Sequence, residues 1–227
     1  MRRAILSVAD KTGVADLARV LDSLGWEIVS SGGTAQFLHD NGIKVLEVSE
    51  VTGFPEILGG RVKTLNPRIH GGILARRSVQ EDLEELRLHN IAPVDMVVCN
   101  LYPFVEAAKR PGVIIEQMIE QIDIGGPSLL RAAAKNYRWV TVVCNPERYR
   151  EIIRELKDTG DVNLSLRQKL AVEVFLHTSS YDAAIASYFG SKWPESRAGF
   201  PEELALAYTK VLFFKVRREP SSEGCLL

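Results

Sequence analysis

The sequence lacks the features of a secreted or membrane-bound protein. It contains three cysteines, Cys99, Cys144 and Cys225, with no C-x-x-C spacing, so neither a disulfide framework nor a cysteine metal site is expected. No apolar run approaches the roughly 18 residues that span a bilayer. The apolar stretch after Arg3 ends at Asp10, too early for a signal peptide. These absences predict a cytoplasmic protein without membrane contact.

The sequence also lacks an excess of positive or negative charge. The net charge of −1 over 227 residues argues against a nucleic-acid surface. The 46% hydrophobic and 25% charged residues exclude a disordered or fibrous chain and suffice for a buried core. Neither the dinucleotide motif G-x-G-x-x-G nor the P-loop motif is present. None of the four histidines has a partner at metal-ligand spacing, so we expect core or surface roles for them and no metal. A globular enzyme is the remaining expectation.

Short apolar runs alternate with helical patterns along the first two thirds of the chain. The runs predict buried strands over residues 4–8, 26–29, 44–48, 94–99 and 140–144. After the first run, apolar residues at helical spacing predict a helix that Thr12 caps and Gly25 ends. This alternation predicts an α/β fold with a central, mostly parallel sheet over residues 1–145. From residue 146 to 212 the pattern indicates a helical C-terminal extension. The aperiodic, glycine-rich segment Thr52–His70 is expected to be a functional loop.

Polar clusters fall where neighbouring strands end, the edge at which parallel sheets bind ligands. Ser31-Gly32-Gly33-Thr34 lies between a strand and a helix, where free amides and hydroxyls suit a phosphate. Lys11 and Thr12 open the preceding helix and could add a charge and a donor. Each turn alone is better explained as an ordinary capped turn, but two at adjacent strand ends favour an anion site.

Two further groups of residues have side chains that could take part in binding or catalysis. Arg61-Val62-Lys63-Thr64 follows two glycines and could clamp a polar substrate, although a solvated surface loop is the more common case. Asp123 and Lys135 bracket a short helix, and a buried lysine near a carboxylate can exchange protons. Such pairs are often purely structural.

Together these residues resemble the N-terminal IMP cyclohydrolase domain of the bifunctional purine biosynthesis proteins. The resemblance runs from residue 4 to about residue 210, with the motifs in the family's order. The motifs are Ser7–Gly13, Ser31–Thr34, Thr52–Glu56, Leu58–Leu65, Cys99–Phe104, Gln121–Gly126 and Leu130–Asn136.

The resemblance implies a methylglyoxal-synthase-like three-layer fold and closure of the ring of 5-formamidoimidazole-4-carboxamide ribotide (FAICAR) to IMP and water. Lys11 and Thr12, with Ser31, Gly32, Gly33 and Thr34, would hold the ribose 5′-phosphate. The base and its carboxamide would lie against Arg61, Val62, Lys63, Thr64, Asn100 and Leu101. Asp10, Ile124 and Gly125 would also bind the substrate. Lys63 and Tyr102 would stabilise charge, and Asp123 and Lys135 would move protons, with Lys135 essential.

The resemblance also implies that the cyclohydrolase needs no cofactor or metal and that the chain forms a homodimer. Its partners would be FAICAR and IMP, with no nucleic acid. In the family a transformylase half follows and uses 10-formyltetrahydrofolate. Ala9 and Asn66 depart from the family's usual serine and histidine. The first change removes a hydroxyl, and the second removes a titratable neighbour of Lys63.

The tail over residues 213–227 departs most strongly from the family's sequence pattern. The family continues L-R-Y-G-E-N-P-H-Q, the start of the transformylase half, whereas this chain has Lys215–Glu223 after Phe214. Codons compatible with these residues, read one nucleotide later, encode R-Y-G-E-N-P-H-Q after a Leu or Ser codon. We expect this tail to be the family's junction in a shifted frame, and the gene sequence tests that hypothesis.

Two other functions are compatible with the same phosphate turns. One is a methylglyoxal synthase, and the other is a non-catalytic effector-binding module like that of carbamoyl-phosphate synthetase. Neither explains the Arg61–Thr64 loop together with the motifs around Asp123 and Lys135.

Overall fold

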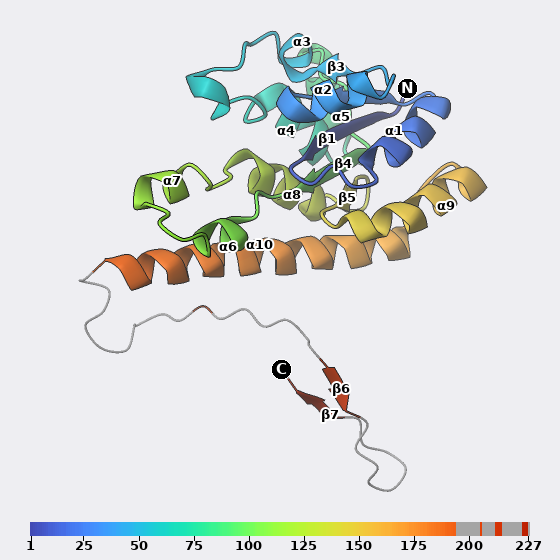
Figure 1. Ribbon diagram of the computed structural model, residues 1–227. Helices are drawn as coiled ribbons and strands as arrows, with labels where there is room; N and C mark the ends of the chain where they lie inside the picture. Colours follow the sequence, from blue (N-terminus) through green and yellow to red (C-terminus); the bar gives the residue numbers. More distant parts are fainter. Residues whose placement is uncertain (194–204, 206–211, 215–223, 227) are drawn as a thin grey trace, which may run out of the picture. The chain divides into compact units, whose positions relative to one another are not determined.

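The computed structural model describes residues 1–193, 205, 212–214 and 224–226 (Figure 1). Two compact units divide the chain, Met1–Thr178 and Ser179–Leu227, and each is described by itself. The division predicted near residue 145 stays a prediction.

The first unit is built on a five-stranded parallel sheet. Its strands are β1 (Arg3–Val8), β2 (Glu27–Ser30), β3 (Leu46–Glu47), β4 (Met96–Asn100) and β5 (Thr141–Val143). They lie in the order β3-β2-β1-β4-β5, and every neighbouring pair is parallel. This confirms the predicted α/β fold. The strand expected over residues 44–48 is only two residues long, because helix α3 begins directly at Val48.

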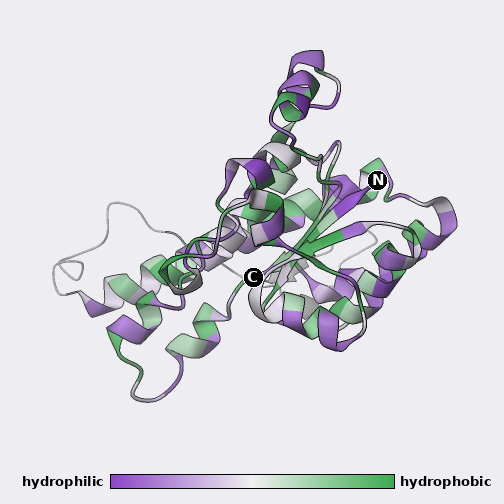
Figure 2. Ribbon diagram, turned by 90° about the horizontal axis from the view of Figure 1, so that it is seen from above, coloured by the Kyte–Doolittle hydropathy of each residue, from purple (hydrophilic) through white to green (hydrophobic). Residues whose placement is uncertain are grey.

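Helices flank the sheet on both sides (Figures 1 and 2). The helices are α1 (Val14–Ser23), α2 (Gly32–Asp40), α3 (Val48–Thr52), α4 (Pro67–Leu74), α5 (Gln80–Leu88), α6 (Phe104–Ala108), α7 (Ile115–Ile119), α8 (Gly125–Lys135), α9 (Tyr149–Thr159) and α10 (Leu164–Lys192). Single 3-10 turns occur at η1 (Leu58–Gly60) and η2 (Pro146–Arg148). Helix α10 begins in the first unit and ends in the second.

The strands are buried because helices cover the sheet on both sides, as a parallel sheet requires. All five residues of β4 are buried, and Val97 and Val98, which point to opposite faces, are fully inaccessible. Figure 2 shows the central strands in the green of apolar residues, whereas the helices mix green and purple. The apolar runs in the sequence therefore mark the core correctly.

Two local predictions need correction. Gly13, not Thr12, is the N-cap of α1, because its left-handed backbone (φ 71°) makes the turn out of β1. The segment Thr52–His70 is not loop throughout, since α4 begins at Pro67. Asn66 caps that helix by accepting a hydrogen bond from the Arg68 amide at 2.9 Å, which gives this residue a structural role.

The second unit contains the C-terminal part of α10 and a pair of antiparallel strands, β6 (Leu212–Phe214) and β7 (Gly224–Leu226). Within the helix, the ring of Phe189 stacks on Trp193 with centroids 4.8 Å apart. Most of the tail for which a frame shift is predicted lies outside the described residues.

Candidate active site

A cavity of about 1420 Å³ lies at the carboxyl ends of the strands. The strand order reverses between β1 and β4, and such a switch point is where open α/β sheets bind ligands. Residues that follow β1, β2, β4 and β5 line the cavity, together with residues 58–65 and 119–126. The structure therefore brings most of the predicted site residues into one cavity.

The turn after β2 presents an unpaired donor to this cavity. The Ser31 hydroxyl is buried without a hydrogen-bond partner, directly before the first turn of α2. Gly32 has a φ of +52°, and a Cβ there would lie 3.4 Å from the ammonium nitrogen of Lys63. A free hydroxyl, helix N-terminal amides and an ammonium group at one point suit a phosphate.

A second ammonium group, that of Lys11, belongs to the same region. Lys11 lines the cavity, and its Nζ donates a hydrogen bond to the carbonyl of Val8. Burial lowers the pKa of Lys11; Asp10 opposes the shift, and the charge of Lys63 adds to it. Two like charges held close together favour occupation of the space between them by an anion.

Two residues expected to hold phosphate have other roles. The Thr34 hydroxyl donates to the Val8 carbonyl at 3.0 Å and accepts from the Val8 amide at 3.1 Å, so it joins α2 to the end of β1. Thr12 is exposed and does not line the cavity. Its amide donates to the Asp10 carboxylate, and hydrogen bonds from Thr12 hold the pKa of Asp10 below its usual value.

The loop that carries Arg61–Thr64 forms one wall of the cavity. Ile57 and Val62 pair across it as an antiparallel bridge, and Thr64 is buried. Arg61 forms an ion pair with Glu120, just after α7, and both side chains are more than half exposed. The role of this loop as a substrate clamp stays a prediction, and the Arg61 guanidinium is already paired.

Asp123 lies on the cavity wall where α8 begins. Its Oδ1 accepts a hydrogen bond from the Gly126 amide at 2.8 Å. Burial raises the pKa of this carboxyl, while the Gly126 hydrogen bond and the charge of Lys63 oppose the rise. A carboxylate whose pKa is raised by burial is a better proton acceptor than an exposed one. Asp123 and Lys63 both line the cavity, and the charge of Lys63 acts on the Asp123 carboxyl.

Two glycines allow this close packing. A Cβ at Gly126 would lie 2.5 Å from Oδ2 of Asp123 and 2.6 Å from Cδ2 of Leu101. A Cβ at Gly125 would lie 2.9 Å from Oγ1 of Thr64, so the loop packs directly on the first turn of α8. Ile124 and Tyr102 also line the cavity, and both are more than half exposed.

Lys135 is not among the residues that line the cavity in the described part of the chain. It is exposed at the far end of α8, an 11-residue helix whose first turn lies at the cavity. At 1.5 Å per residue the two ends are about 16 Å apart. The sequence spacing of Asp123 and Lys135 therefore places them at opposite ends of one helix.

The cavity has one wall that the sequence did not predict. Cys144 and Asn145 follow β5, and Glu173 and His177 project from the first half of α10. Glu173 accepts a hydrogen bond from Asn145 at 3.3 Å, and Nε2 of His177 is buried without a partner. The core or surface role expected for His177 stays a prediction, and the structure places this residue on the cavity wall. No motif marked this wall, because the residues are far apart in the sequence.

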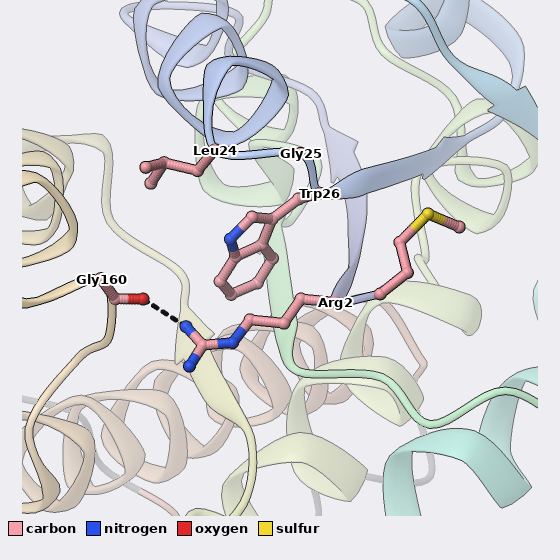
Figure 3. Close-up of a pocket in the computed structure, with 6 residues that line it drawn as sticks. Arg2, Leu24, Gly25, Trp26 and Gly160 are labelled. Atoms are coloured by element: carbon pink, nitrogen blue, oxygen red, sulfur yellow. Dashed lines mark hydrogen bonds between the residues drawn. The ribbon is translucent and has the colours of Figure 1, made fainter.

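A smaller cavity of about 340 Å³ lies at the opposite edge of the sheet, near the start of β1 and β2 (Figure 3). Arg2 lies over the ring of Trp26, 5.3 Å from its centroid, and donates a hydrogen bond to the Gly160 carbonyl. Its polar group is thus already paired, and its position is not the ligand-binding edge of the sheet.

Two kinds of feature are absent from the described residues. These residues contain no group of three histidine, cysteine or acidic side chains arranged to hold a metal. No helix in the same residues is both long enough and apolar enough to cross a membrane. The thiols of Cys99 and Cys144 are free and buried. Burial raises the pKa of Cys144 to about 12, and the charge of Glu173 adds to the rise.

Two protein-family models match this chain. Residues 13–128 match a model described as "MGS-like domain". Residues 133–216 match one described as "AICARFT/IMPCHase bienzyme". The matches cover both the α/β layer and the helices that follow it.

Known proteins show the same similarity. The chain is 56% identical over 197 residues to "Bifunctional purine biosynthesis protein PurH" of Gloeothece citriformis, covering 86% of this chain and 38% of that protein. The protein of the same name from Acetivibrio thermocellus is 49% identical over 224 residues, 99% of this chain and 43% of that protein. The chain thus spans about two fifths of the length of these relatives. A solved structure titled "Crystal structure of ForH" superposes with a TM-score of 0.78 at 36% identity, covering 84% of this chain and 98% of that one.

Proposed function

Because the chain belongs to the AICARFT/IMPCHase bienzyme family of purine biosynthesis and carries an MGS-like domain, we propose that its large cavity is an IMP cyclohydrolase site. The substrate is FAICAR and the products are IMP and water. The observation that carries the proposal is that one cavity brings together Asp123, Lys63 and the turn of Ser31, whose buried hydroxyl has no partner.

The 5′-phosphate binds at the turns that carry Lys11 and Ser31, both of which line the cavity. The Lys11 ammonium group supplies charge, and the Ser31 hydroxyl supplies a donor that has no partner in the described part of the protein. The base then extends over the end of β4 toward Leu101 and Asp123, under the loop that carries Arg61. Closure of a ring needs this kind of orientation, because both reacting groups belong to one molecule.

Ring closure forms a bond between the carboxamide nitrogen and the formyl carbon. Asp123 accepts the proton that the nitrogen loses, and burial suits it to this task because its pKa is raised. Lys63 and Tyr102 stabilise the negative charge that develops on the formyl oxygen. The oxygen takes up that proton to give a hydroxyl. The former formamide nitrogen then loses its own proton and forms a double bond to the carbon, and the hydroxyl takes up a second proton and leaves as water.

The two alternative functions are less well supported. A methylglyoxal synthase or an effector-binding module would use the same phosphate turns. Neither accounts for the match of residues 133–216 to the bienzyme model, nor for the identity to purine biosynthesis proteins over 86% of the chain or more.

Further features of the proposal come from the family resemblance alone. The chain works as a homodimer in the cytoplasm, and its cyclohydrolase step uses no cofactor. The full-length protein also carries a formyltransferase that uses 10-formyltetrahydrofolate. Lys135, if it moves a proton, is contributed by the second copy, because it lies outside the cavity of its own chain.

Incubation of the purified chain with FAICAR tests the proposal. The ultraviolet spectrum is expected to change as the imidazole ribotide becomes a purine. AICAR, which lacks the formyl group, is the matched control and should give no change. Dihydroxyacetone phosphate tests for methylglyoxal formation. An unchanged spectrum with FAICAR, from protein that is folded and binds IMP, would contradict the proposed activity.

A further inference from the structure

The loop between α3 and α4 contains a tight hairpin with an unusual residue at its tip. The Ile57 amide donates to the Val62 carbonyl at 3.2 Å, and the Val62 amide donates to the Ile57 carbonyl at 3.4 Å. Three residues at the tip have positive φ angles, which are 54° at Leu58, 63° at Gly59 and 93° at Gly60. Glycine adopts such angles at little cost, whereas a bulky side chain is rarely found there. Leu58 therefore occupies a position where the backbone favours glycine.

Core packing does not explain why this position holds a leucine. Leu58 lines the cavity, and 71% of its surface is exposed. Among the described residues one other non-glycine residue has a positive φ, and it is Asn90, a residue type that takes the left-handed region more readily. Strained residues persist only where the surrounding structure holds them, and they cluster at active sites and ligand clamps. Strain and exposure together thus mark Leu58 as a candidate for ligand contact.

Two contacts after the tip hold the loop against the segment that leads into α8. Arg61 forms an ion pair with Glu120. Thr64 packs on Gly125, where a Cβ would lie 2.9 Å from its Oγ1. The Leu58 carbonyl accepts a hydrogen bond from the Arg61 amide at 3.4 Å, so the tip is joined to the first of these contacts. The ion pair and the packing contact thus keep Leu58 at the edge of the cavity.

Other exposed side chains of the cavity wall are also apolar or aromatic. They are Tyr102, Ile119 and Ile124. The last two belong to the segment on which the loop packs. The turns that carry Lys11 and Ser31 line the same cavity. Sites for small organic ligands combine apolar walls with a few polar groups that fix the orientation. The cavity therefore suits a ligand with an anionic end and an apolar face.

The end of β4 offers less to a base than its sequence promised. Oδ1 of Asn100 accepts hydrogen bonds from the amides of Ala9 at 2.6 Å and Asp10 at 2.8 Å. An amide oxygen has two lone pairs, so both acceptor positions are occupied. The oxygen of Asn100 is therefore not available to a base, which leaves a larger share of base binding to apolar contacts.

We propose that Leu58 is a specificity-determining residue that packs against one face of the heteroaromatic base of the bound nucleotide. The base is the part of such a ligand that has an extended apolar surface. The contact buries apolar surface of the leucine, which offsets the cost of its left-handed backbone. The nature of the ligand rests on the proposed function, whereas the strain and exposure of Leu58 do not.

The test compares binding of IMP with binding of ribose 5-phosphate, which lacks the base, in Leu58→Ala and Leu58→Gly. Calorimetric titration should show both variants binding IMP about tenfold less tightly, because the groups that cover the ring are removed. Their affinity for ribose 5-phosphate should equal that of the wild type. KM for FAICAR should rise by a similar factor while kcat stays within about threefold. Leu88→Ala is the matched control, because Leu88 is 75% exposed at the end of α5 and does not line the cavity.

Urea unfolding of the same variants tests the strain. Leu58→Gly should unfold at a higher urea concentration than Leu58→Ala, because glycine relaxes the left-handed backbone and alanine does not. Leu58→Asn takes the left-handed region readily but has a polar side chain. It should fold like the wild type and still lose affinity for IMP.

Unchanged affinity for IMP in all three variants would overturn the proposal. An equal loss for IMP and ribose 5-phosphate would also overturn it, since the loop would then act on the whole cavity. So would a changed oligomeric state in light scattering with unchanged IMP affinity, because Leu58 would then contact a second copy. If the alanine and glycine variants do not fold, Leu58→Asn decides. Wild-type protein that binds IMP without converting FAICAR would contradict the proposed function and leave the base contact standing.

Discussion

At the scale of single residues, the proposed chemistry of this site depends on polar groups that are buried at a cost in free energy. Asp123 is a carboxyl whose pKa is raised by burial, and Ser31 has a buried hydroxyl without a partner. Gly126 is required beside Asp123 because a Cβ there would overlap its carboxylate. Such costs are typical of functional sites, where stability is lost for the sake of activity.

Asp123→Asn is expected to lower kcat about a hundredfold or more, because the proton acceptor is lost. The free energy of unfolding at pH 7 should stay the same or rise, since the amide oxygen still accepts from Gly126 and no charge is buried. A raised pKa means that the folded protein binds the proton more tightly than the unfolded chain. The stability that Asp123 contributes is therefore lost as the pH rises from its ordinary pKa, 3.8, to the raised value.

Urea unfolding between pH 4 and pH 7 measures this effect, and the acid limb of the wild-type kcat profile should lie above pH 3.8. Asp158→Asn, at an exposed carboxylate of α9, is the control and should change neither quantity. A variant at position 123 that is less stable than the wild type at pH 7 would show that the carboxylate has a mainly structural role.

At the scale of elements, the cavity is closed by segments that are not part of the sheet. The loop between Ile57 and Thr64 packs on the start of α8 through Thr64 and Gly125. It also reaches residue 120, after α7, through the Arg61–Glu120 ion pair. A substrate that needs the Arg61 guanidinium must compete with Glu120 for it. Exposed ion pairs of this kind contribute only about 0–1 kcal/mol to stability. A substrate group can therefore replace Glu120 as the partner of Arg61.

Glu120→Gln should therefore strengthen IMP binding by up to about fivefold, the equivalent of about 1 kcal/mol. Calorimetric titration with IMP at low and high salt measures this change in affinity. The increase in affinity should be smaller at high salt, because the Arg61–Glu120 pair is exposed and salt screens it. Glu116→Gln is the matched control, because Glu116 lies one turn earlier, on α7, and does not pair with Arg61. Weaker binding of IMP by Glu120→Gln would mean that the pair holds the loop in its binding position.

At the scale of the whole molecule, one proposed catalytic residue lies apart from the others. Lys135 is at the opposite end of α8 from Asp123, and the helix is rigid over that length. An essential role for Lys135 is therefore compatible with this fold only if a second chain supplies it. The homodimer and the role of Lys135 are thus one linked proposal.

Mixing of two inactive variants tests this link. Asp123→Asn and Lys135→Ala are each expected to lose turnover, and unfolding and refolding them together in equal amounts should restore about a quarter of wild-type activity. Half of the dimers are then mixed, and one of their two sites has both native residues. Light scattering checks that the mixture is dimeric. Full activity of Lys135→Ala alone, or no recovery in the mixture, would contradict the proposal.

The order of strands and helices, the buried core and the turns that follow β1 and β2 were all predictable from the sequence. Apolar periodicity and turn residues are local signals, and the strands at β1, β2 and β4 follow them closely. The family motifs also named most of the cavity residues. Local sequence could not show which side chains remain free to contact a ligand once the chain has folded.

Only the tertiary structure decided that Asn100 and Thr34 are occupied by backbone groups, and that Lys135 lies outside the cavity. It also brought Glu173 and His177 to the cavity from helix α10, which follows β5 in the chain. Hydrogen-bond partners and the ends of helices depend on contacts between residues far apart in the chain. Composition and spacing determine the kind of fold and the edge that binds the ligand, and long-range packing determines which atoms can act there.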